Sequence, residues 1–99
     1  MADVESMVQE GEALLNQFEY EKSYEKFSKA IKEEESARAY FGRAEAALGI
    51  NEVESEDILE DYEKAIELDD NPFYRQATAG FCVDIGKFEE AEKHRSEER

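Results

Sequence analysis

The chain offers few side chains that could do chemistry, and its only cysteine and only histidine are among them. His94 lies in the polar run HRSEER without a second histidine, whereas a zinc site needs a set of such ligands. Cys82 shares a helical stripe with Thr78 and Ile85, where a free cysteine usually packs as a small apolar residue. No base is available to activate it as a nucleophile. We therefore expect neither a transition-metal site nor a reactive thiol.

Two acidic segments raise the question of a calcium site. Residues 33–35 read EEE and residues 67–71 read ELDDN, but neither has the alternating oxygen ligands and central glycine of a calcium loop. The sequence also contains no nucleophile paired with a base and no phosphate-binding glycine loop. We expect a protein that is not an enzyme, without catalytic residues, cofactor or metal.

Length and charge restrict the partners of the chain. Its 99 residues suffice for one small domain, residues 1–99. The formal charge of -15 repels nucleic-acid phosphates and anionic membrane surfaces. The first residues, MADVESM, contain no basic leader, and no run approaches the roughly 18 apolar residues of a membrane helix. We expect a cytoplasmic protein that binds neither nucleic acid nor membranes.

The elements that would position any functional side chain are amphipathic helices that repeat. Between residues 20 and 31 the apolar and small side chains follow the i, i+3, i+4, i+7 spacing of one helix face. Phe27 and Ala30 recur 35 residues later as Tyr62 and Ala65, and a third copy begins at Phe88. Another amphipathic segment precedes each copy, at residues 6–16, 37–48 and 73–85. The sequence predicts an all-α protein of about three helix pairs, approximately residues 4–35, 36–70 and 71–99, the last one short.

Capping residues predict where the helices begin and end. Asp3 and Ser36 are suitable N-caps, and Asn71 can cap a helix whose first residue is Pro72. Gly49 and Gly86 stand where left-handed helix ends usually fall. The pattern therefore predicts a helix break at each of these two glycines.

With this period the sequence resembles the tetratricopeptide repeat family over nearly its whole length. The residues that carry the resemblance are Gly11, Tyr20, Phe27 and Ala30 in the first unit, Tyr62, Ala65, Leu68 and Asp69 in the second, and Pro72, Ala79, Gly86, Phe88 and Ala91 in the third. The chain departs from the family pattern at Met7 and Arg75, where a bulkier residue is usual, and it has extra residues, INEVESE, in the second unit. Two alignments of that unit remain open. The resemblance implies an α-α superhelix, a right-handed solenoid, that acts as a protein-binding adaptor or scaffold.

In such a fold the first helix of each pair lines a concave groove that holds a peptide or a helix. Residues of the first helices outside the packing stripes are therefore candidates for partner binding: Val8, Glu12, Leu15, Arg38, Phe41, Glu45, Phe73, Gln76 and Gly80. The lysine, asparagine and arginine set with which family members hold acidic chaperone tails is missing from the matching places. A basic or apolar-basic segment is the better candidate, with Phe41 or Phe73 as anchor.

The short end of the chain raises an alternative function. Repeat stacks normally finish with a polar capping helix, and without one the last inner face stays exposed. We expect a monomer, with two alternatives: a homodimer through the C-terminal repeat at Phe81, Cys82, Ile85 and Phe88, or a fragment of a longer repeat protein. Because the net charge opposes self-association, such a dimer should strengthen as salt rises.

Overall fold

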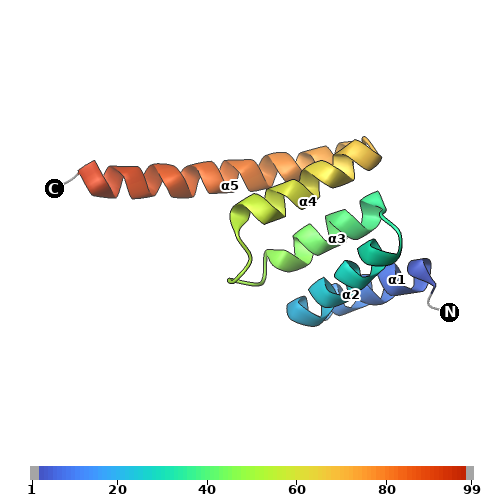
Figure 1. Cartoon of the computed structure of the whole chain (residues 1–99). Helices are drawn as coiled ribbons and strands as arrows, with labels where there is room; N and C mark the ends of the chain where they lie inside the picture. Colours follow the sequence, from blue (N-terminus) through green and yellow to red (C-terminus); the bar gives the residue numbers. More distant parts are fainter. Residues whose placement is uncertain (1–2, 98–99) are drawn as a thin grey trace.

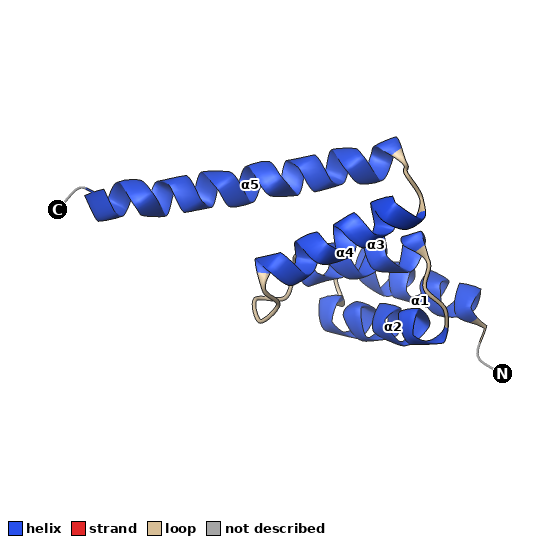
Figure 2. Cartoon of the chain, turned by 45° about the horizontal axis from the view of Figure 1, so that its top comes forward, coloured by secondary structure: helices blue, strands red, loops and turns tan. Residues whose placement is uncertain are grey.

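Five helices make up the computed structural model, which describes the backbone of residues 3–97 and the side chains of residues 3–86 (Figure 1). They are α1 (Val4–Asn16), α2 (Tyr20–Glu33), α3 (Ala37–Ala47), α4 (Ser55–Leu68) and α5 (Pro72–Glu97). No strand is found among the described residues (Figure 2). The all-α prediction is confirmed.

The helices pack in chain order. Each of the first four packs on the next, α4 packs on α5, and α1 also contacts α3. Successive helices run in opposite directions, so α1, α3 and α5 share one direction and α2 and α4 the other (Figure 1). The first helices of the expected units therefore lie in parallel, and a surface that they share is built from α1, α3 and α5.

Phe27 of α2 joins the first three helices. Its side chain is fully buried, and it packs with Val8 of α1 and Ala39 of α3. A methyl group on Gly11 would come within 2.9 Å of the Phe27 ring, and one on Gly42 within 2.3 Å. Both glycines are therefore needed so that α1 and α3 can approach one aromatic ring.

A second core cluster repeats this arrangement around Tyr62 of α4. Tyr62 is 1% exposed and packs with Ala44, Ala47 and Ile58, with Phe41 and Phe81 against them. Ala44 thus stands to Tyr62 as Gly11 stands to Phe27. The α1 and α3 positions are 33 residues apart, but the α2 and α4 positions are 35 apart, so the extra residues belong to the turn between α3 and α4. The packing thus makes Ala44 the counterpart of Gly11.

The predicted N-caps are confirmed. The Asp3 side chain accepts a hydrogen bond from the Glu5 amide, and the Ser36 side chain accepts one from the Ala39 amide. The Asn71 side chain accepts a hydrogen bond of 2.8 Å from the Phe73 amide, and α5 begins at Pro72. Each side-chain oxygen satisfies an amide that has no partner within its helix.

The prediction that Gly49 and Gly86 adopt left-handed conformations is wrong. No glycine among the described residues has a positive φ. α3 ends with a turn of residues 48–50 whose amides bond back to Ala44, Ala46 and Ala47. Among the residues that the structure describes, only Phe18, which follows α1, is left-handed, with φ of 64°.

The third unit is not the helix pair that was expected. Residues 72–97 form one helix that runs through Gly86 and projects past the other four (Figures 1 and 2). A single glycine inside a helix costs only about 1 kcal/mol, and no proline or second turn residue follows it here. No neighbouring helix packs near Gly86 to stabilise a turn, so the helix continues. The side chains of Phe88, Ala91 and His94 lie outside the described set.

Within the described part of the chain, no helix combines the length and the apolar character that crossing a bilayer requires. In the same part of the chain, no group of three or more His, Cys, Asp or Glu side chains is arranged to hold a metal ion.

Candidate partner-binding face

Two matching stripes form the surface that α1 and α3 share. On α1 the stripe is Glu5, Val8, Glu12 and Leu15, and on α3 it is Arg38, Phe41, Glu45 and Leu48. Both have the i, i+3, i+7, i+10 spacing of one helix face. Phe73 at the start of α5 lies beside this surface, because its ring centroid is 5.5 Å from that of Phe41. We call the surface that these two stripes and Phe73 form the first-helix face.

Arg38 is held between two carboxylates of α1. Its Nε and Nη2 donate to the two oxygens of Glu12 at 2.8 and 2.6 Å, and its Nη1 donates to Glu5 at 2.7 Å. The bonds to Glu12 and then to Glu5 raise the pKa of Arg38. The guanidinium is thus already occupied by two carboxylates, and the three side chains together remain negative. Glu12 and Arg38 were predicted for this face; Glu5 was missed, although it precedes Glu12 by two turns.

Three aromatic rings lie next to this ion cluster and form what we call the aromatic platform: Phe41, Phe73 and Tyr74. Phe41 and Tyr74 stack with ring centroids 4.6 Å apart, and Phe41 also meets the edge of Tyr62. Burial raises the pKa of Tyr74. Phe73 is 64% exposed, so the platform presents one ring to solvent on rings that are fixed beneath it. Tyr74 was not predicted, because only the tertiary structure brings it over Phe41.

Some predicted site residues occupy other places. Val8 is 2% exposed and belongs to the core around Phe27, so its assignment to the groove is wrong. The α1 stripe turns inward at this position because Phe27 and Ala39 cover it. Phe41 is half-buried and supports Phe73 instead of standing free. Cys82, expected to pack as a small apolar residue, is exposed.

The far end of the first-helix face has a shallow depression. It measures about 400 Å³ and is lined by Leu15, Asn16, Phe18, Tyr20, Glu45, Leu48 and Gly49. The Tyr62 hydroxyl donates to Glu45 at 2.5 Å, which fixes this carboxylate between α3 and α4. Burial, and then Glu45, raise the pKa of Tyr62. Leu15 and Glu45 were predicted for the groove, and the structure brings them together here. The remaining candidates, Gln76 and Gly80, are exposed on α5.

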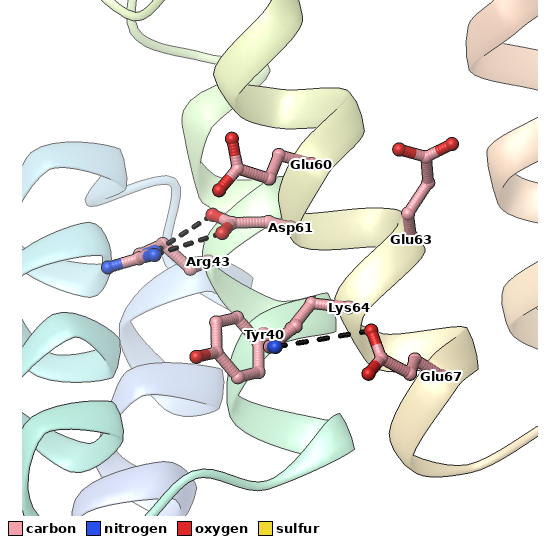
Figure 3. A pocket seen from close by; sticks show the side chains of 7 residues that line it. All are labelled: Tyr40, Arg43, Glu60, Asp61, Glu63, Lys64 and Glu67. Atoms are coloured by element: carbon pink, nitrogen blue, oxygen red, sulfur yellow. Dashed lines mark hydrogen bonds and ion pairs between the residues drawn. The ribbon is translucent and has the colours of Figure 1, made fainter.

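A second cavity, of about 350 Å³, lies between α3 and α4 away from this face (Figure 3). At its base Arg43 donates to both oxygens of Asp61, at 2.8 and 2.9 Å, and its guanidinium lies 5.7 Å from the Tyr24 ring centroid. Asp61 is 7% exposed. Because both charges are satisfied by each other, this cluster joins helices and offers no open ligand position.

Tyr40, which also lines this cavity, gives the fold a measurable pH dependence. Burial, and then a hydrogen bond of 2.8 Å to Glu35, raise the pKa of Tyr40 from 10.0 to about 12. The fold favours the neutral phenol, so this contribution is complete below about pH 10 and is lost as pH rises toward 12. We expect the melting temperature to fall over this range, and Tyr40→Phe to make the fall shallower. An unchanged slope in that variant would contradict this assignment. The ultraviolet absorbance of tyrosinate reports the titration directly.

Comparisons of the chain with protein-family models, with curated proteins and with solved structures found no match. The resemblance to the tetratricopeptide repeat family therefore stays a prediction from the sequence.

Proposed function

We propose that the chain is a tetratricopeptide-type interaction module, an adaptor or scaffold that binds a basic or apolar-basic helix on its first-helix face. Each core cluster places one aromatic residue of a second helix against a small residue of a first helix. The small residues of the two clusters are 33 residues apart and the aromatic residues 35 apart, and these spacings support a repeat. The parallel course of α1, α3 and α5 supports a shared binding surface.

The observation that carries this proposal is Phe73 on the aromatic platform. A large apolar ring that is 64% exposed, yet held against Phe41 by packing, loses little conformational freedom on binding. Aromatic anchors of this kind dominate the energy of many interfaces. The platform thus supplies an apolar anchor point beside a negative surface.

The charges of the face select the partner. Arg38 is bound by Glu5 and Glu12, and Glu45 adds a further carboxylate, so the face attracts cations. An acidic tail would find no free clamp among these residues and would meet the net charge of -15. We propose that acidic chaperone tails do not bind and that lysine- or arginine-rich helices do.

A fluorescence titration tests this proposal. The protein has no tryptophan, so a basic amphipathic helical peptide with one tryptophan can be observed without background. We expect Phe73→Ala to weaken binding about tenfold or more, since it removes the anchor. Leu68→Ala is the matched control, because Leu68 is 46% exposed but lies at the end of α4. Equal effects of both variants would contradict a specific role for the platform.

The charge selection has its own test. Glu12→Gln should weaken the binding of the basic peptide severalfold and reduce the salt dependence of this binding. Glu63→Gln on α4 should change neither quantity. A peptide with glutamate in place of lysine should not bind. Tighter binding of the acidic peptide than of the basic one would refute the proposed partner class.

Self-association is a second candidate, favoured by the projection of α5 beyond the other helices (Figure 1). Val83 is 53% exposed on this helix, and Ile85 is partly exposed. Light scattering at low and high salt distinguishes the two candidates. A dimer that strengthens with salt supports self-association, whereas a monomer in both conditions leaves the first-helix face as the functional surface.

A further inference from the structure

Phe18 adopts a backbone conformation that its side chain disfavours. It follows α1 with φ of 64°, and the Glu19 and Phe18 amides donate to the Leu14 and Leu15 carbonyls at 2.9 and 3.0 Å. This is a helix end in which glycine or asparagine usually takes the left-handed position. For a bulky residue the same conformation is strained and costs stability. A less costly residue at position 18 would therefore serve the turn better.

The fold does not recover this cost by burying the ring. Phe18 is 75% exposed, and its aromatic neighbour Tyr20 lies at a centroid distance of 6.3 Å in a tilted orientation. An exposed aromatic side chain that is also strained contributes little to the free protein. Such strain is found preferentially at functional sites.

Other apolar side chains gather around Phe18. Leu48 is 52% exposed, Leu15 is partly exposed, and both line the same 400 Å³ depression as Phe18 and Tyr20. A methyl group on Gly49 would lie 2.4 Å from the Tyr20 ring, so the end of α3 is packed closely against the start of α2. We call Leu15, Phe18, Tyr20 and Leu48 the Phe18 patch.

The rim of the Phe18 patch is acidic. Glu45 lines the depression, and Glu19 and Glu21 line the adjoining hollow next to Phe18. Lys22 is the one cation among the residues that line these two hollows, and it pairs with Glu19 at 3.7 Å. The rim therefore remains negative, and it complements an apolar side chain that is flanked by lysine or arginine.

We propose that the Phe18 patch is a second anchor site for the basic partner helix of the first-helix face. This inference rests on the proposed function and specifies its partner. Leu48 of the patch is the C-cap of α3 and follows Phe41 of the platform by seven residues, which corresponds to about 10 Å along a helix. A helix lying along α3 therefore presents two apolar anchors seven residues apart, one to Phe73 and one to Phe18. Its basic residues lie between them, over Glu12 and Glu45.

The test uses two lysine-rich helical peptides, each with one tryptophan. The first has leucine at two positions seven residues apart, and in the second alanine replaces the leucine that reaches the patch. We expect Phe18→Gly to weaken the binding of the two-leucine peptide about tenfold and to leave the binding of the one-leucine peptide unchanged, since only the two-leucine peptide engages the patch. Phe73→Ala should weaken both peptides.

Thermal unfolding of the same variants separates binding from folding. Phe18→Gly should raise the melting temperature by roughly 4–8 °C, because glycine adopts the left-handed conformation without strain. Phe18→Ala keeps the left-handed strain and should lose binding without that rise. A variant that is more stable and binds less tightly is the expected signature of strain retained for recognition.

The outcomes distinguish this inference from the proposed function. If Phe73→Ala weakens both peptides and Phe18→Gly weakens neither, the second anchor is wrong and the proposed function stands. If the wild-type protein binds neither peptide, both are wrong. If Phe18→Gly lowers the melting temperature, the ring is a structural element and the inference is overturned.

Discussion

Phe27→Ala is expected to lower the free energy of unfolding by about 3–5 kcal/mol, a large share of the stability of a 99-residue domain. The Phe27 ring is fully buried and lies against Gly11 of α1 and Gly42 of α3, neither of which has a side chain to fill the space it would leave. Truncation therefore opens a cavity at the junction of three helices. The loss should be near the upper end of the range, because the backbone at the two glycines is fixed within α1 and α3 and cannot move into the cavity.

Chemical denaturation followed by circular dichroism measures this loss. Phe73→Ala is the matched control, since the same side chain is removed from a position that is 64% exposed, and we expect a change below about 1 kcal/mol there. Similar losses in the two variants would show that Phe27 does not join the helices in the way described. Gly42→Ala should also destabilise the fold, because its methyl group would overlap the same ring.

The second large effect is expected at the ion pair between Arg43 and Asp61 (Figure 3). Asp61→Asn leaves the guanidinium of Arg43 without its bidentate carboxylate between α3 and α4, and we expect a loss of about 2–4 kcal/mol. The value falls below that of a fully buried pair because the Arg43 side chain is 23% exposed and can reach some water. Ser28 and the Tyr24 ring retain weak contacts with Arg43.

A double variant separates the pair from its surroundings. Arg43→Met with Asp61→Leu removes both charges and keeps apolar volume, so it should recover most of the stability that Asp61→Asn loses. Glu25→Gln serves as the exposed control, because its pair with Lys29 lies on the solvent side of α2 and should change the midpoint little. If the double variant is as unstable as Asp61→Asn, packing around the pair, and not the uncompensated charge, accounts for the effect.

The sequence by itself determined where the first four helices lie and where the fifth begins. The 35-residue spacing of Phe27 and Tyr62 predicted the two buried aromatics, and Asp3, Ser36 and Asn71 predicted three helix starts. These features are readable because helix periodicity and N-capping depend on residues within a few positions of one another. The candidate surface on the first helices followed from the same periodicity.

Only the tertiary structure decided which side chains of that surface are free. Val8 and Glu12 lie on one stripe of α1, yet Phe27 and Ala39 bury the first, and Arg38 binds the second from 26 residues away. The break expected at Gly86 is absent because no neighbouring helix packs there to favour a turn, and Phe18 takes the left-handed position expected of a glycine. The burial of Val8 and the binding of Glu12 depend on contacts between helices distant in sequence. At Gly86 and Phe18 the chain chooses between local conformations that differ by only 1–3 kcal/mol or so.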